Sequence, residues 1–205
     1  MIFWDLSVQP FARHENRIPP SPTAVALGKF DGVHNGHRAL LRATAQTAAQ
    51  NGLVPAVFTF TAHPAALPLL SDAEEQLAIF RACGIQYVFQ YDFQTVQRMT
   101  PGEFVRQILC ETLHAVYALC GENFHFGVGA SGDADDLRRE MELCGGSGSV
   151  IPSVKYGDSV VCSTLIRSLL TRGDIITANR LLGQPYSFSG AVVHGNRIGH
   201  QIQIP

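Results

Sequence analysis

Short hydrophobic runs alternate along the chain with longer segments whose apolar residues recur at helical spacing. The runs are rich in valine, alanine, isoleucine and aromatic residues, a composition typical of strands that are buried on both faces. Five such runs cover residues 23–30, 54–60, 85–91, 115–120 and 150–156. Helical patterns separate them, and two more follow, near residues 164–170 and 174–183. This alternation predicts an α/β fold in which a parallel sheet is covered by helices on both faces.

Capping and turn residues mark the ends of several predicted elements. Ser71 and Glu74 have the spacing of a capping box, in which a hydroxyl and a carboxylate bind free backbone N–H groups at a helix start. Thr100 and Glu103 repeat that spacing. Residues 145–149, with the sequence GGSGS, are expected to form the turn before the fifth strand.

The composition is that of a folded domain without disulfide bonds. The 205 residues are 46% hydrophobic, enough to bury a core, and the five cysteines are odd in number and form no C-x-x-C pair. A reduced intracellular setting follows. No apolar run approaches the roughly 18 residues of a membrane span, and the first residues lack the basic-then-apolar order of a signal peptide. We therefore predict a cytoplasmic protein with no membrane partner.

The charge balance argues against nucleic acid as a partner. The formal net charge is -2, so the chain lacks the excess of lysine and arginine that binding to phosphate backbones requires. We expect small molecules as its ligands instead.

Three glycines, at positions 127, 129 and 132, form a G-x-G-x-x-G pattern, which marks dinucleotide-binding sites when its context is right. That context is a strand directly before the first glycine and an acidic residue about 20 positions later. Six residues separate Gly127 from the run at 115–120, and no acidic residue stands near position 152. We expect a flexible loop here. The chain also lacks the G-x-x-x-x-G-K-[ST] pattern of a P-loop.

The ten residues 28–37, GKFDGVHNGH, follow the first predicted strand and lead into a helix expected to start near His37. Ligands of parallel sheets bind at the carboxyl ends of the strands, where this segment lies. A helix start offers free N–H groups and the positive end of its dipole to anions. Gly36 lets a ligand approach the backbone, and Gly32 allows a sharp turn after Asp31. The segment is therefore fit to bind phosphate.

Three interpretations of this segment compete. In the first, His34 and His37 are surface residues of an ordinary turn. In the second, Asp31, His34 and His37 bind a metal ion, since all three are common ligands, although no further ligand is obvious nearby. In the third, both histidines donate hydrogen bonds to phosphate. We prefer the third because it uses every residue of the segment.

The same ten residues resemble the G-x-F-D-G-V-H-x-G-H segment of the prokaryotic bifunctional riboflavin kinases and FMN adenylyltransferases, members of the H-x-G-H nucleotidyltransferase superfamily. Further segments resemble this family in the same order; they are FTAHP at 60–64, GENFHFGVGASGD at 121–133, CSTLIR at 162–167 and ANRLLGQPYSFSGAVVHGNRIG at 178–199. The chain departs from the family pattern at Ala62, Ala130, Cys162 and Leu165.

The resemblance implies a doubly wound, five-stranded parallel sheet with strand order 3-2-1-4-5. It also implies that the terminal phosphate of FMN attacks the α-phosphate of ATP, with Mg²⁺ present, giving FAD and pyrophosphate. Two alternatives stay open. One is adenylyl or cytidylyl transfer to another phosphate acceptor, and the other is a flavin-binding module that lost catalysis.

The resemblance further implies roles for individual residues. The catalytic residues would be His34, His37 and Arg167. The nucleotide would be bound by Phe30, Asp31, Gly32, Gly36, Asn123, Ser163 and Thr164, with Asn123 also beside Mg²⁺. His63 would line the FMN side. Each assignment has a plainer rival: Arg167 as a surface cation, Asn123 as a turn former, and His63 as a capped loop histidine.

Two domains are expected, with residues 1–184 forming the adenylyltransferase and residues 185–205 resembling the start of a riboflavin kinase β-barrel. Two alternating runs, 186–193 and 200–204, are expected to be strands. The P-T-A-N motif of that kinase does not occur, so we expect no riboflavin kinase activity unless the native chain continues past Pro205. The tail would be mobile or paired, against the main domain or against another copy, which leaves a homo-oligomer open.

Overall fold

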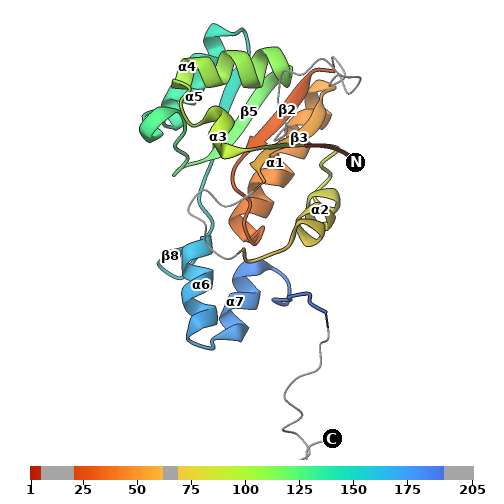
Figure 1. Ribbon diagram of the computed structural model, residues 1–205, viewed down its shortest axis with the longest axis vertical. Coiled ribbons are helices and arrows are strands. Elements are labelled where there is room, and N and C mark those ends of the chain that lie inside the picture. The colour runs from red at the N-terminus through yellow and green to blue at the C-terminus, as the bar shows by residue number, and fades with distance from the viewer. Residues whose placement is uncertain (6–20, 62–68, 192–205) are drawn as a thin grey trace, which may run out of the picture.

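A six-stranded parallel sheet forms the centre of the molecule, with helices on both of its faces (Figure 1). The structure is a computed structural model, and it describes residues 1–5, 21–61 and 69–191. The strands of the sheet are β1 (Ile2–Asp5), β2 (Thr23–Leu27), β3 (Val54–Phe60), β4 (Tyr87–Tyr91), β5 (Ala115–Gly121) and β6 (Ser147–Ile151).

The strand order is β1-β4-β3-β2-β5-β6. Its last five members stand in the predicted order 3-2-1-4-5, so the predicted fold class and order are confirmed. The count is wrong by one, because β1 pairs with β4 at the outer edge of the sheet. The chain builds outward from β2 through β3 to β4 and then returns to place β5 on the other side of β2. The switch point of the sheet therefore lies between β2 and β5, where a ligand crevice is expected.

Two layers of helix cover the sheet. The helical elements are α1 (Asn35–Asn51), α2 (Ala73–Ala82), α3 (Phe93–Val96), α4 (Pro101–Glu103), η1 (Phe104–Thr112), η2 (Val128–Ala130), α5 (Ala134–Leu143), α6 (Ser163–Thr171) and α7 (Ile175–Leu182). Core contacts place α1 and α2 on one face of the sheet and η1 and α5 on the other. The predicted last two helices, α6 and α7, pack together in a third apolar cluster below the sheet (Figure 1).

Every residue of β2 is buried, which is why this strand has no polar face. Ala24 and Ala26 pack on the side of α1 and α2, whereas Val25 and Leu27 pack on the side of η1 and α5. Successive side chains of a strand alternate between faces, so a strand covered twice needs apolar residues throughout. The strand ends at Leu27, and the segment that follows it, residues 28–37, enters the crevice.

One predicted capping box is confirmed and the other is wrong. Thr100 and Glu103 form the reciprocal hydrogen bonds of the box. For α2, however, the N-cap is Asp72, whose carboxylate accepts a hydrogen bond from the Glu75 N–H at 2.8 Å. The hydroxyl of Ser71 instead accepts a hydrogen bond from the N–H of Gly32, 39 residues earlier in the chain. Ser71 therefore makes a tertiary contact, and the helix start lies one residue later than predicted.

The segment Phe104–Thr112, expected to be an ordinary helix, is a π-helix. Its wider turn is visible in the hydrogen bond from the Leu113 N–H to the Ile108 carbonyl, at 2.9 Å and five residues apart. Its buried residues, Phe104, Val105, Ile108 and Leu109, pack against the sheet.

The fifth predicted strand begins and ends earlier than expected. Residues 147–149, assigned to a turn because of their glycine and serine content, belong to β6. A side chain at Gly148 would place its Cβ 2.7 Å from the Cα of Arg138, so this glycine lets α5 pack closely onto the strand. Residues 155 and 156 form instead a short hairpin, in which β7 (Lys155–Tyr156) pairs with β8 (Ser159–Val160).

The tail beyond α7 is described as far as residue 191. Residues 185–191 contain no strand, so the expected strand at 186–193 is not found in its described part, and residues 192–205 lie outside the described residues. The boundary between two domains at 184 and 185 stays a prediction. Among the described helices, none is long and apolar enough to cross a membrane.

Candidate functional site

The segment between β2 and α1 is a tight turn with strained backbone. Phe30 and Val33 have φ values of 51° and 32°, in the left-handed region that bulky residues rarely occupy, and Gly32 has a φ of 75°. Both bulky side chains are fully buried, which holds the strained conformation in place. Backbone strain of this kind is often found at functional sites.

The helix after this turn begins two residues before the expected position. His34 is its N-cap, and the His34 Nδ1 accepts a hydrogen bond from the N–H of His37 at 3.3 Å. In a neutral imidazole only one nitrogen carries a proton, so this bond leaves the proton of His34 on Nε2. The two imidazole rings stack with centroids 3.7 Å apart. The His37 ring also lies 5.1 Å from the ring of Phe30.

Both histidines are held in the neutral form at pH 7. Burial lowers the pKa of His34 to about 4, although the nearby carboxylate of Asp31 partly opposes that effect. Burial, together with the neighbouring His34, lowers the pKa of His37 well below its usual value. The pair therefore offers directed hydrogen-bond donors rather than two positive charges.

These lowered pKa values predict a stability that falls in mild acid. Below pH 6.5, the ordinary pKa of histidine, the unfolded chain takes up protons that His34 and His37 do not take up in the folded protein. The free energy of unfolding should therefore drop by up to about 1.4 kcal/mol per pH unit for each histidine. Urea unfolding at pH 6.5 and at about pH 5 measures this drop for the parent and for His34→Asn, which keeps a capping oxygen but does not titrate. The variant should lose less stability than the parent, and equal losses would contradict the expectation.

Asp31 connects the turn to two distant segments. Its buried carboxylate forms an ion pair with Arg167 and accepts a hydrogen bond from the Leu70 N–H at 2.7 Å. Its carbonyl oxygen accepts a hydrogen bond from the Ser163 hydroxyl at 2.9 Å. Asp31 therefore anchors the turn to α6, and its carboxylate is already engaged within the protein.

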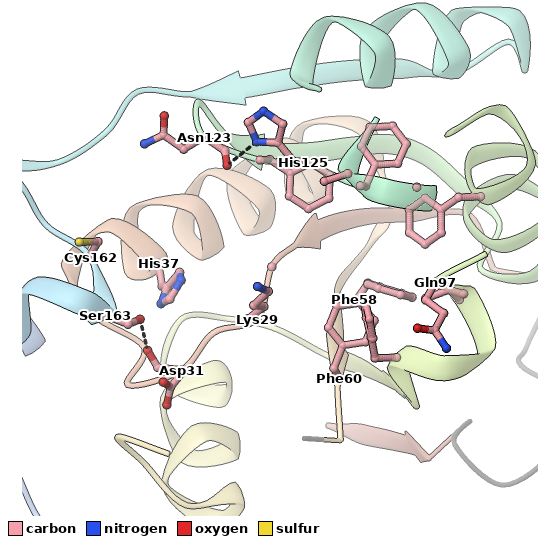
Figure 2. A pocket seen from close by; sticks show the side chains of 18 of the residues that line it. Lys29, Asp31, His37, Phe58, Phe60, Gln97, Asn123, His125, Cys162 and Ser163 are labelled. Carbon is pink, nitrogen blue, oxygen red and sulfur yellow. Dashed lines mark hydrogen bonds between the residues drawn. The ribbon is translucent and has the colours of Figure 1, made fainter. Parts of the chain in front are cut away.

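A cavity of about 820 Å³ opens at the carboxyl ends of β2, β3 and β5. Its polar lining consists of Lys29, Asp31, His34, His37, Gln97, Asn123, His125, Ser163 and Thr164. Its aromatic lining consists of Phe58, Phe60, Phe93, Phe104, Phe124 and Phe126. In Figure 2 the labelled His37 and Ser163 lie on one side and Phe58 and Phe60 on the other, with Lys29 between them. The cavity thus suits a long ligand that has both charged and aromatic parts.

A second hollow of about 230 Å³ adjoins the first. The two share Gly28, His34, His37, Asn123, Phe124 and Cys162, so the histidine pair stands where they meet. Gly36 lines the second hollow, and a Cβ there would lie 3.2 Å from the ring of His34. Glycine at this position therefore leaves room for the ring of His34, and its expected role in letting a ligand approach the backbone stays a prediction.

The start of α6 forms part of the wall. Cys162 is the N-cap of this helix and makes no capping hydrogen bond with its side chain. The next two residues, Ser163 and Thr164, line the cavity. A helix start whose N–H groups have no side-chain cap can accept an anion, with the helix dipole in support.

The structure brings together most of the residues that the sequence singled out. His34, His37, Asn123, Ser163 and Thr164 line the cavity, and Asp31 lies at its edge. Phe30, Gly32 and Arg167 are absent from the described walls of both hollows. Phe30 is fully buried in the core, against the rings of Phe80 and His37, so it supports the site rather than lining it. His63 lies outside the described residues.

The metal-binding interpretation of the turn finds no support. Among residues 1–5, 21–61 and 69–191, no group of three or more histidine, cysteine, aspartate or glutamate side chains could hold a metal ion. The acidic residue Asp133 is the N-cap of α5, so its carboxylate is engaged by the backbone of that helix.

The G-x-G-x-x-G pattern is explained by packing. Residues 126 and 132 pair across a tight turn that contains η2. A Cβ at Gly127 or Gly132 would lie within 2.9 Å of the ring of Pro101, so both glycines are needed where the turn rests on that ring. Ala130, in this turn, has a φ of 55° and lines the cavity.

Sequence reasoning missed Lys29 and the aromatic wall. Lys29 is the variable position within GKFDGVHNGH, so the motif gave it no role. Four of the six aromatic residues occur as i, i+2 pairs, Phe58 with Phe60 and Phe124 with Phe126, a spacing that places both members of a pair on one face of an extended segment. That spacing, at the end of one predicted strand and in the loop after another, was the available signal.

Comparisons with known proteins agree with this geometry. A family model described as FAD synthetase matches residues 17–165. The bifunctional riboflavin kinase/FMN adenylyltransferase of Listeria monocytogenes is 32% identical over 88% of this chain, and that of Escherichia coli K12 is 29% identical over 93% of it. The chain spans 60% and 63% of the lengths of these two relatives.

A solved structure has the same fold. It is described as a macrolide-efflux protein from Streptococcus pneumoniae, superposes with a TM-score of 0.83, and is 28% identical. The match covers 100% of this chain and 67% of that one.

Proposed function

Because this chain belongs to the FAD synthetase family, we propose that it transfers the adenylyl group of ATP to FMN, giving FAD and pyrophosphate. The observation that carries this proposal is the cavity at the switch point, in which a histidine pair and a helix start adjoin a wall of phenylalanines. FMN has a phosphate at one end and a flat aromatic ring system at the other. Both parts find matching surfaces in one cavity.

The reaction needs two polyanions to be brought into contact. A phosphate oxygen of FMN forms a bond to the α-phosphorus of ATP while the bond from that phosphorus to the leaving pyrophosphate breaks. FMN phosphate is already a nucleophile, so the protein contributes positioning and charge stabilisation rather than a strong base. We assign the hydrogen bonds at the α-phosphate to His34 and His37, and those at the leaving pyrophosphate to Ser163, Thr164 and the start of α6.

We assign Arg167 a different role from the catalytic one that the family resemblance implies. Its guanidinium is paired with the buried carboxylate of Asp31, and Asp31 accepts the hydroxyl hydrogen bond of Ser163. This arrangement supports a positioning role, in which Arg167 holds the turn and the start of α6 in register.

Mg²⁺ fits this site as a companion of ATP. The described walls provide oxygen atoms from Asn123, Ser163 and Thr164 but no cluster of carboxylates. Mg²⁺ keeps several waters and commonly binds substrate phosphates, so it does not need a cage of protein ligands. Bound to the triphosphate, it would reduce the charge on the leaving pyrophosphate. The requirement for Mg²⁺ and the oligomeric state stay predictions.

A second acceptor class is less well matched by the cavity. Transfer to a pantetheine phosphate or a glycerol phosphate would leave the phenylalanine wall without an aromatic partner, whereas a flavin ring can stack on it. The aromatic lining therefore favours FMN over these acceptors.

Mixing the purified chain with FMN, ATP and Mg²⁺ should yield FAD and pyrophosphate, separated and measured by chromatography. Glycerol phosphate in place of FMN serves as the control acceptor and should give no adenylylated product. If the folded chain forms no FAD at saturating substrates, the proposal fails, and if it still binds FMN, the flavin-binding module becomes the better interpretation. Riboflavin offered with ATP tests the expected absence of kinase activity.

A further inference from the structure

The positive charge in the cavity comes from an unexpected residue. Both histidines are neutral near pH 7, because burial lowers the pKa of each. Arg167 is paired with Asp31 and is not part of the described walls. Of the described residues that line the two hollows, Lys29 alone is a lysine or arginine. A site for two polyanions thus has a single lysine or arginine side chain in its described lining.

The backbone holds Lys29 at the point where β2 leaves the sheet. Its carbonyl oxygen accepts a hydrogen bond from the Thr59 hydroxyl at 3.2 Å, and the preceding residue, Gly28, donates its N–H to the Phe58 carbonyl. Lys29 is therefore tied to β3, the strand that carries Phe58 and Phe60. Its side chain is exposed and stands between His37 and these two phenylalanines (Figure 2).

We infer that Lys29 is a substrate-binding residue that holds the phosphate of FMN between the phenylalanine wall and the histidine pair; this inference rests on the proposed function. The ring of a flavin stacked on the phenylalanines directs its phosphate toward the histidines, and that path passes Lys29. An ammonium group there offsets the repulsion between the incoming phosphate and the triphosphate. The start of α6, on the far side of the histidines, is the better seat for the triphosphate.

In this role Lys29 contributes to the binding of FMN and not to the binding of ATP. Removing the charge of Lys29 should weaken the binding of FMN, which has the phosphate, and leave the binding of riboflavin, which lacks it. ATP binding should change little. A residue with only a structural role would instead change the binding of both flavins together.

The experiment titrates the purified chain with FMN and, separately, with riboflavin, following the quenching of flavin fluorescence. Lys29→Met should lower FMN affinity about tenfold, the usual scale for one charge-assisted contact, while the riboflavin affinity stays constant. Lys29→Arg should restore much of the preference for FMN. Lys155→Met is the matched control, since Lys155 is an exposed lysine that lines neither hollow. Added salt should weaken FMN binding more in the parent than in Lys29→Met.

Each outcome bears on a different claim. Equal losses for FMN and riboflavin, an unchanged FMN affinity, or a loss confined to ATP would each overturn the role of Lys29 while the parent still makes FAD. A parent chain that binds neither flavin and makes no FAD would instead overturn the proposed function.

Discussion

The His37→Ala variant is expected to make FAD at about one-hundredth to one-thousandth of the parent rate at saturating FMN and ATP. Loss of one preorganised hydrogen-bond donor at a developing negative charge lowers rates by this factor in other enzymes. His37 lines both hollows, and its neutral ring stacks on His34 at the start of α1. Initial rates of FAD formation measure the effect.

The ring of His37 also packs against its neighbours, so a second variant is needed. His37→Phe keeps a ring against Phe30 and His34 but removes both nitrogens. Its rate should fall as far as that of His37→Ala, while its thermal midpoint stays closer to that of the parent. A His37→Phe variant within about threefold of the parent rate, far short of the usual effect of such a donor, would make His37 a packing residue.

The Asp31→Ala variant is expected to be less stable than the parent by about 3 kcal/mol, the scale for removing one partner of a buried ion pair. The carboxylate is 2% exposed and binds both Arg167 and the Leu70 N–H. Its removal takes a charged partner from Arg167 and an acceptor from a buried N–H group, and both losses are costly away from water. Urea unfolding at pH 7 gives the difference in the free energy of unfolding.

Asp135→Ala is the matched control for this experiment. Asp135 also pairs with an arginine, Arg138, but its side chain is 84% exposed. Surface pairs of this kind contribute little because water already solvates both charges. If Asp31→Ala shifted the unfolding midpoint no more than Asp135→Ala, the network around Asp31 would not be a source of stability.

The centre of the fold could be predicted from sequence because buried parallel strands leave a strong local pattern. Every residue of β2 is buried, so its composition alone marks it as a central strand. The outer strand β1 has four residues and finds its partner in β4, with Ile2 opposite Tyr87. No local pattern predicts a pairing across that distance. The glycine of β6 led to the wrong prediction of a turn for a similar reason. Gly148 allows the close packing of α5 onto the strand and does not mark a turn.

The candidate site was predicted where its residues share a short motif. His34, His37 and Gly36 stand within four positions of one another, and Ser163 and Thr164 are adjacent. Two other features depend on tertiary contacts: Ser71 bonds to Gly32 instead of capping α2, and Arg167 pairs with Asp31. The spacing of residues along the sequence does not reveal such contacts. The role of Lys29 follows from the lack of any other lysine or arginine among the described residues that line the two hollows. This lack becomes visible only once the folded structure shows which residues line them.

The hydrogen bond between the Ser163 hydroxyl and the Asp31 carbonyl joins residues 132 positions apart. On a ribosome that adds roughly 5–20 residues per second, α6 is made on the order of ten seconds after the turn that it holds. Towards the end of that interval the nascent chain contains the turn and all of the phenylalanine wall but still lacks α6, whose start lines the same cavity. We expect this exposed aromatic surface to be a target for chaperones, and the yield of active protein in a cell to depend on how well that interval is protected.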